Sequence, residues 1–304
     1  MFRLIASRFL QGLLTLFVLV TLTFFLVRAM PGSPYTEAKA MPEHVIAAKK
    51  ASLGLDKPWP VQYSLYLSNL IFKQDPGLLI RKPGVRVSEV IGDSFPVSMA
   101  LGLASMGIAL VVGIPAGVIA AVKKNSPTDF ACLGFAMLGI CLPSFVIGPL
   151  LAVFAGLKLQ ALNVAGWSTP TDWILPAVTL GFINAAYLAR LSRGGMLDVL
   201  NQDYIRTAKA KGVPGSRIII RHALKGGLIP AVAFSGPAFA AMISGSFVIE
   251  TIFQIPGMGQ HFVNAATDRE FFLIQGLVLF YGFLIVAANL LADLAQIALN
   301  PRLR

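Results

Sequence analysis

Hydrophobic residues run in long, nearly uncharged stretches along this chain, and charged residues fall mainly between them. A helix that crosses the hydrocarbon core of a bilayer needs about 20 consecutive apolar residues. Six stretches meet this requirement: Phe9–Val27, Val97–Val122, Phe130–Leu157, Trp173–Leu191, Leu228–Ile249 and Phe272–Leu299. The pattern therefore predicts an all-α integral membrane protein with six transmembrane helices.

Positive charges are distributed unevenly among the segments that flank these stretches. Lys and Arg concentrate in the short cytoplasmic loops of membrane proteins. With six spans, most of the basic residues outside the first connection fall on one side: Arg3, Arg8, Lys123, Lys124, Arg193, Arg206, Lys209, Lys211, Arg217, Arg221, Lys225, Arg302 and Arg304. The short connections on the other side carry only Lys158 and Arg269. We therefore predict that both termini are cytoplasmic.

The first connection, residues 29–96, is long and is predicted to lie on the extracytoplasmic side. Long segments cross the membrane largely regardless of their charge. It is rich in proline and shows helical patterns near Glu43–Ser52 and Val61–Phe72, which predict a small ordered cap. The chain thus divides into an N-terminal transmembrane helix (1–28), the extracytoplasmic segment (29–96) and a five-helix core (97–304).

The N-terminus has features of a secretory signal, because Arg3 and Arg8 precede an apolar run. That run has 19 residues, whereas the apolar part of a signal peptide has roughly 7–15. No clean A-x-A cleavage site follows it. We favour a retained first span over a cleaved signal.

Composition supports a membrane protein. Of 304 residues, 56% are hydrophobic and 13% are charged, against about 25% charged in soluble domains. The net charge of +11 would suggest nucleic acid binding in a soluble protein. Here cytoplasmic loops in contact with membrane lipid explain it, and no nucleic acid partner is expected. Cys132 and Cys141 lie on opposite faces of one predicted helix, so no disulfide or cysteine metal site is expected.

The fifth predicted span presents small residues at every fourth position, namely Ala233, Pro237, Ala241 and Gly245. We call these four the small-residue face. Small residues at this spacing let helix backbones approach closely in membranes. Tight helix packing and a transport pathway lined by small groups are both compatible with the pattern.

Chemical signatures inside the spans are sparse. Glu250 and Arg190 lie at span ends, and Asp293, in the last span, is predicted to have a packing or registry role. An ion-coupled carrier usually has acidic residues near the middle of the membrane, so this class is disfavoured. H-E-x-x-H, G-x-S-x-G and the phosphate-binding G-x-x-x-x-G-K-[ST] are absent from the sequence. We therefore predict a chain that is not an enzyme, binds no cofactor and takes any energy from another chain.

The loop 190–227 is the most informative segment. It has 38 residues, where roughly 2–8 commonly connect packed helices. Its pattern predicts a helix near Gln202–Lys211, capped by Asn201 or Asp203, and a second helix over Ser216–Lys225. Gly212 is predicted to end the first helix in a left-handed conformation. A basic helical pair of this kind either lies on anionic lipid or docks into a cytoplasmic partner.

A family resemblance favours the second alternative. The loop contains Ile205-Arg206-Thr207-Ala208-Lys209-Ala210-Lys211-Gly212, then Arg221–Lys225 and Ile229-Pro230. This arrangement closely resembles the cytoplasmic loop of ABC-type importer permeases of the dipeptide, oligopeptide and nickel branch, and is nearest to the B-type membrane subunits of oligopeptide importers. Four further segments also resemble this branch: Ala29–Pro34, Ser94–Ser98, Leu142–Phe145 and Val248–Gln260. The resemblance covers essentially the whole chain.

The resemblance implies a multi-pass protein of the bacterial inner membrane that imports peptides, with dipeptides, nickel or another solute as alternatives. It implies a homologous second permease, two ATPase subunits that bind the ATP, and an extracytoplasmic peptide-binding protein. The loop would couple to the ATPases through Tyr204, Ile205, Arg206, Thr207, Ala208 and Gly212. The wider superfamily begins this motif with Glu-Ala-Ala, whereas this chain has Arg206-Thr207-Ala208. An ion pair from that Glu is therefore not expected here.

Overall fold

The computed structural model describes residues 2–31, 35, 42–244 and 246–299. These residues form helices and turns, and their only extended pairing is an isolated bridge between Leu78 and Arg86. Four helical stretches are long and apolar enough to cross a membrane, and two bent helix pairs raise the number to six if each is one span. The predicted all-α membrane fold is confirmed.

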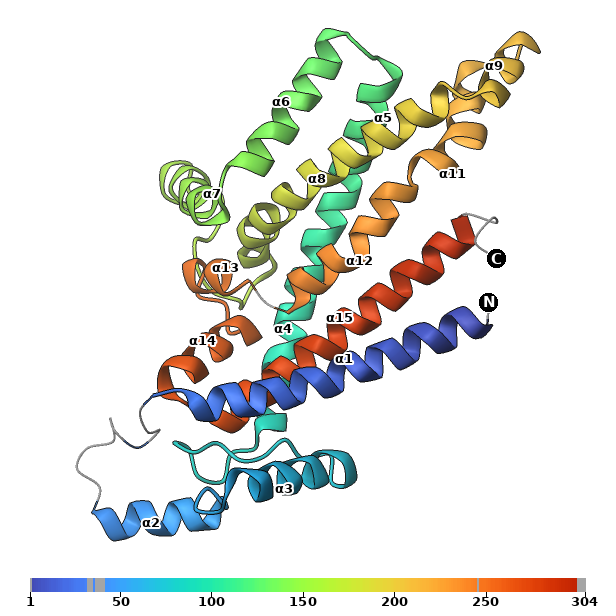
Figure 1. Ribbon diagram of the computed structural model, residues 1–304. Helices are drawn as coiled ribbons and strands as arrows, with labels where there is room; N and C mark the ends of the chain where they lie inside the picture. The colour runs from blue at the N-terminus through green and yellow to red at the C-terminus, as the bar shows by residue number, and fades with distance from the viewer. Residues whose placement is uncertain (1, 32–34, 36–41, 245, 300–304) are drawn as a thin grey trace.

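The helices containing the spans are α1 (Phe2–Ala29), α4 (Val87–Ile108) with η1 (Ala109–Gly113) and α5 (Ile114–Val122), α6 (Pro127–Cys141) with α7 (Ser144–Leu151) and η2 (Ala152–Lys158), η3 (Pro170–Trp173) with α8 (Ile174–Leu200), α12 (Ile229–Ile243) and α15 (Phe271–Leu299). Shorter helices are α2 (Glu43–Ser52), α3 (Trp59–Phe72), α9 (Asp203–Ala210), α10 (Gly215–Arg217), η4 (Ile218–Ala223), α11 (Leu224–Gly227), α13 (Phe247–Ile252) and α14 (Met258–Asp268). In Figure 1, α9 lies at one end of the molecule and α2 and α3 at the other.

Two predicted span boundaries are wrong. The second span begins ten residues earlier, at Val87 rather than Val97, because a transmembrane helix tolerates an internal proline such as Pro96 when neighbouring groups satisfy the backbone. The fourth continues to Leu200, so the loop predicted from Arg190 is eleven residues shorter at its start.

The third and fifth predicted spans are not single straight helices. The helices on either side of Leu142 and Pro143 meet at an angle of 106°. Leu142 is extended, as expected for a residue before proline, and Pro143 supplies no N–H to continue the helix. The fifth helix ends at Ile243 and not at Ile249, and α13 and α14 follow where only a loop was predicted.

The first and last spans pack side by side (Figure 1). Small residues allow this approach, since a Cβ on Gly12 would lie 2.6 Å from Val286 and one on Gly282 only 2.4 Å from Leu19. Near the N-terminus of α1 and the C-terminus of α15, Arg8 pairs with Asp293 at 3.1 Å. Asp293 therefore contacts a neighbouring helix, which is compatible with the predicted packing or registry role.

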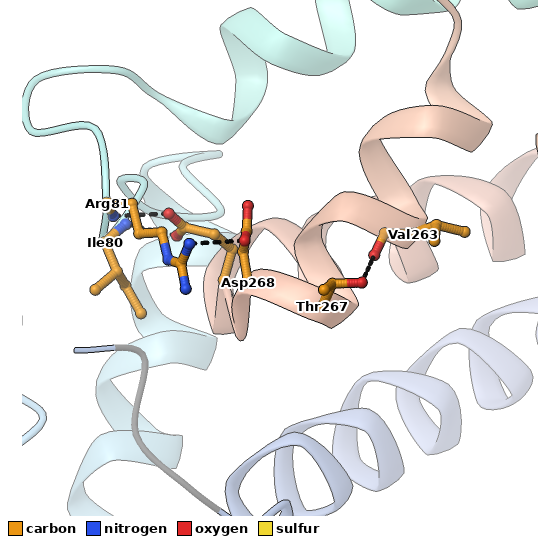
Figure 2. A network of polar contacts seen from close by, with 6 residues as sticks. Ile80, Arg81, Val263, Thr267 and Asp268 are labelled. Atoms are coloured by element: carbon orange, nitrogen blue, oxygen red, sulfur yellow. Dashed lines mark hydrogen bonds and ion pairs between the residues drawn. The ribbon is translucent and has the colours of Figure 1, made fainter. Parts of the chain in front are cut away.

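The cap helices α2 and α3 confirm the two helical patterns predicted in this segment. Gln62 accepts a hydrogen bond from Arg28 Nε at 2.8 Å, which joins the cap to α1. At the α14–α15 junction, the Glu270 carboxylate accepts hydrogen bonds from the Ile80 and Arg81 amides at 2.6 and 2.7 Å. The Arg81 guanidinium also contacts Asp268 at 2.7 Å (Figure 2). The cap is therefore joined to the C-terminal end of α1 and to the N-terminal end of α15.

Glu250, on α13, is fully buried. Its carboxylate accepts hydrogen bonds from Ser98 Oγ and from the Gln260 amide, each at 3.1 Å. Ser98 Oγ in turn accepts one from the Met258 amide at 2.9 Å. The carboxylate therefore joins α4, α13 and the N-terminus of α14, where the helix dipole favours a negative charge.

Two glycines leave room for this carboxylate. A Cβ on Gly257 would lie 2.6 Å from the Glu250 carboxyl group, and one on Gly259 would lie 2.9 Å from Oε2. The buried Glu250 carboxyl group therefore requires residues without a Cβ at both positions.

Glu250→Ala is expected to destabilise the protein by about 1–3 kcal/mol or more, because it leaves buried donors without an acceptor. Glu250→Gln retains one carbonyl acceptor and should cost less. Thermal unfolding in detergent, followed by loss of the monodisperse species, measures the difference. Glu43→Ala removes an exposed carboxylate and serves as the control. Equal unfolding temperatures for Glu250→Ala and this control would contradict the assigned role.

Candidate functional site

Residues 203–227, from α9 to α11, form a helical hairpin beyond the end of α8. Its inner side is apolar, and Ile205 is fully buried. Ile205 packs in a cluster with Met196 and Val199 of α8 and with Ile218 and Ala223 of the hairpin itself. The hairpin is therefore held rigidly to the end of a spanning helix.

Gly212 ends α9 in the predicted left-handed conformation, with φ of +74°. Its amide donates to the Lys209 carbonyl at 3.0 Å, and the Val213 amide donates to the Ala208 carbonyl at 3.2 Å. These two bonds constitute a Schellman motif, which glycine adopts at low cost.

The predicted cap of the first hairpin helix is wrong, although both hairpin helices begin within one residue of their predicted positions. The N-cap positions are Gln202 and Pro214, and neither provides a side-chain cap hydrogen bond. Asn201 and Asp203, which were proposed as caps, therefore do not have that role.

The outer side of the hairpin is exposed and basic. Tyr204, Arg206 and Thr207 are exposed, whereas Ile205 and Ala208 pack inward. Arg206 pairs with Asp203 at 3.4 Å, but both side chains are more than 70% exposed, so the pair contributes little. The exposed basic residues of the hairpin are Arg206, Lys209, Lys211, Arg217, Arg221 and Lys225.

The small-residue face points away from the core of this chain. Pro237 and Ala241 are exposed and Ala233 is partly buried, while Gly245 lies outside the described residues. Packing within the chain uses another face of α12, where a Cβ on Gly236 would lie 2.4 Å from Ala292. Pro237 and Ala241 are therefore free for a partner or a solute.

Exposed residues also lie along one side of α8. Tyr187, Arg190 and Gly194 are exposed at helical spacing, and the Tyr187 ring lies 5.5 Å from Phe234 of α12. We call these three residues of α8 the open strip. Sequence analysis did not identify this strip, because the spacing along α8 does not show which side its neighbours cover.

The described residues contain no group of three His, Cys, Asp or Glu side chains that could hold a metal ion. Cys132 and Cys141 are free thiols.

Two family models match the sequence. Residues 113–304 match the family described as "Binding-protein-dependent transport system inner membrane component". Residues 1–102 match the corresponding N-terminal family of membrane components.

Similar proteins include the oligopeptide transport system permease protein OppB of Haemophilus influenzae, which is 41% identical over the full length of both chains. The dipeptide transport system permease protein DppB of Bacillus subtilis is 40% identical, covering all of this chain and 98% of its own. Among solved structures, an inward-facing MetNI methionine ABC transporter has a TM-score of 0.58 at 15% identity, covering 70% of this chain and 97% of its own.

The low identity to MetNI shows a shared fold only. The family match spans well over half of the chain, and the OppB likeness extends from end to end. The chain therefore belongs to the family of binding-protein-dependent transport system inner membrane components, and it has the helical fold of ABC transporter permeases.

Proposed function

We propose that this chain is the membrane-spanning permease subunit of an ATP-driven oligopeptide importer. The observation that carries the proposal is the 41% identity with OppB proteins over the full length. Import of dipeptides is the second candidate, because the Bacillus subtilis DppB protein is almost equally similar.

The proposal includes a homologous second permease, two ATPase subunits and an extracytoplasmic peptide-binding protein. This chain would be non-catalytic and without a cofactor, since its sequence lacks a phosphate-binding loop. ATP would be bound by the ATPase subunits. The small-residue face, comprising Ala233, Pro237, Ala241 and Gly245, would line part of the transport path, and the exposure of Pro237 and Ala241 supports this.

Reconstitution into liposomes tests this dependence on partners. The chain alone should show no uptake of peptide under a proton or sodium gradient. Addition of the second permease, the ATPases, the binding protein and ATP should produce uptake. Gradient-driven uptake by the single chain would reject the proposal in favour of an ion-coupled carrier.

We also propose that both termini and the hairpin face the cytoplasm and that residues 29–96 lie outside. The supporting observations are the bias of Lys and Arg in short loops and the position of α9 at the end opposite to α2 and α3 (Figure 1).

Cysteines introduced singly at Lys73 and at Lys211, in a chain without Cys132 and Cys141, should label from opposite sides of the membrane. An impermeant maleimide applied to spheroplasts should modify Lys73→Cys at once and Lys211→Cys only after permeabilisation. Labelling of both positions from one side would exclude this topology.

The hairpin is proposed to couple the permease to the ATPases through the surface around Tyr204, Arg206 and Thr207. Ile205 and Ala208 would support that surface from beneath, and Gly212 would set its orientation. The observations in favour are the rigid attachment to α8 and the exposed outer side.

Gly212→Val is expected to reduce ATPase association or to uncouple ATP hydrolysis from uptake. A β-branched residue is strained at positive φ, at a local cost of about 1 kcal/mol or more. Pull-down of the assembled complex and peptide-stimulated hydrolysis measure the effect.

Gly54→Val is the matched control, because Gly54 also has positive φ, with open space around it, in the cap. It should leave coupling unchanged. Normal ATPase binding and uptake in Gly212→Val would show that the hairpin is not the coupling element. That result would favour the alternative in which the hairpin lies on anionic lipid.

A further inference from the structure

The cap helix α3 is uncharged over its whole length, Trp59–Phe72. One side of it packs against the spanning helices. Tyr66 lies in a cluster with Val20 and Phe24 of α1, and Leu279 of α15 packs against the same cluster. The helix α3 therefore lies against the side of the α1–α15 pair and not only over its end.

The contacts between α3 and α1 lie well inside the first span. That span has 24 residues, Ala6–Ala29, or about 36 Å at 1.5 Å per residue, against about 30 Å for the hydrocarbon core. The Tyr63 hydroxyl lies 2.6 Å from Thr21 Oγ1. Thr21 is eight residues before the end of α1, which is about 12 Å along the helix.

The last span gives the same position for α3. Leu279 is eight residues after Phe271, the first residue of α15, so it also lies about 12 Å inside its helix. Figure 1 shows α3 beside α1. Two spanning helices thus independently place α3 at the level of their apolar segments.

The opposite side of α3 is exposed and mainly apolar. Four large apolar side chains on it are between 41% and 82% exposed, namely Val61, Leu65, Ile71 and Phe72. At about 100° per residue they fall within an arc of about 120° that faces away from the packed side. We call these four residues the outer side of α3. The polar residues within this arc are Ser64 and Ser68, and Ser64 Oγ donates to the Val61 carbonyl at 3.0 Å.

The outer side of α3 continues the exposed surface of the first span. The Phe25 ring of α1 lies 5.7 Å from the Tyr63 ring. Phe25 and its neighbours Leu22 and Leu26 are 40%, 56% and 67% exposed. A contiguous apolar surface of this kind marks a contact with a membrane or with another protein. Because it continues from a spanning helix at the depth of its apolar segment, the observations favour lipid.

An apolar cavity adjoins α3 on the same side of the molecule. It has a volume of about 580 Å³ and is lined by residues of α1, α3, α4 and α15. Its walls include Leu16 and Phe283, which lie farther from the cap than Thr21 and Leu279, and its polar lining residues are Gln74 and Ser88. The walls offer apolar contact and few hydrogen-bonding groups, so an acyl chain suits this cavity better than water does.

The ends of α3 have residues typical of a membrane interface. Trp59 begins the helix and is 48% exposed, and Lys57 and Lys73 flank it. Trp is enriched at the level of the headgroups, and Lys extends its ammonium group to water from such positions. An interfacial helix lies with its apolar side about 5–10 Å into the boundary between headgroups and acyl chains.

We propose that α3 is an interfacial membrane helix, whose outer side and adjoining cavity contact the acyl chains of lipids in the leaflet on the cap side. The cap is then anchored in the bilayer as well as to α1 and α15. This inference requires only the membrane fold and does not depend on which solute is transported.

Fluorescence quenching by lipid tests the inference. The full-length chain without Cys132 and Cys141 receives one cysteine, Leu65→Cys or Phe72→Cys on the outer side, or Gly92→Cys in the cavity. A Cβ on Gly92 would meet no atom within 4 Å. Each cysteine is labelled with bimane, and the protein is reconstituted in phosphatidylcholine vesicles with and without phosphatidylcholine brominated on its acyl chains.

Two matched variants define the limits of the measurement. Leu26→Cys reports the exposed surface of α1, and Glu43→Cys reports the exposed surface of α2. Brominated lipid should quench the labels at Leu65, Phe72 and Gly92 to an extent comparable with that at Leu26. The label at Glu43 should respond to iodide in the buffer and not to brominated lipid. The quenching at Leu65 and Phe72 should persist when the second permease and the ATPases are added.

Four outcomes would overturn the inference. Quenching by iodide and not by brominated lipid at Leu65 and Phe72 would place the outer side in water. Quenching by brominated lipid that disappears on addition of the second permease would assign the outer side to that subunit. Protection from both quenchers in the chain alone would show that another part of the chain covers it. Absence of lipid quenching at Gly92 would overturn the assignment of the cavity. Peptide transport is not measured here, so failure of the proposed function would leave these outcomes unaffected.

Discussion

The close approach of backbones around α8 is the interaction on which the rest of this structure depends. A Cβ on Gly117 of α5 would lie 2.3 Å from the Ala189 carbonyl oxygen, and one on Gly181 of α8 would lie 2.7 Å from the Ser105 carbonyl oxygen. In a membrane, the burial of apolar surface does not drive helices together, so van der Waals contact at these short distances stabilises their association. Bulky residues at these positions would separate the helices that surround α8.

The position of α8 determines both candidate surfaces. The C-terminal end of α8 carries the hairpin, because Ile205 of the hairpin packs in one apolar cluster with Met196 and Val199 of α8. Its exposed strip adjoins α12 through the contact between Tyr187 and Phe234. The helix α8 therefore connects the hairpin with the helices that pack around it.

Charge in this chain is used in two ways. The buried carboxylates Glu250 and Glu270 join segments distant in sequence through backbone and hydroxyl donors, and they fix α13, α14 and the cap. Exposed cations, by contrast, gather on the hairpin, with Arg190 alone on the open strip. Paired charges therefore hold the scaffold, and unpaired charges lie where a partner or solute can reach them.

The sequence alone determined the membrane class, the approximate positions of the spans, the cap helices α2 and α3 and the left-handed Gly212. These features depend on apolar run length, on helical periodicity and on the local backbone preference of glycine, all of which are properties of neighbouring residues. Only the tertiary structure decided the helix end at Ile243, the burial of Ile205 and the partners of Glu250. Each of these depends on which distant segment packs against the residue: Glu250 meets Ser98 across 152 positions of the chain. Likewise, the exposure of Arg190 depends on which helices cover α8 and which side they leave open, and the spacing of residues along one helix does not contain that information.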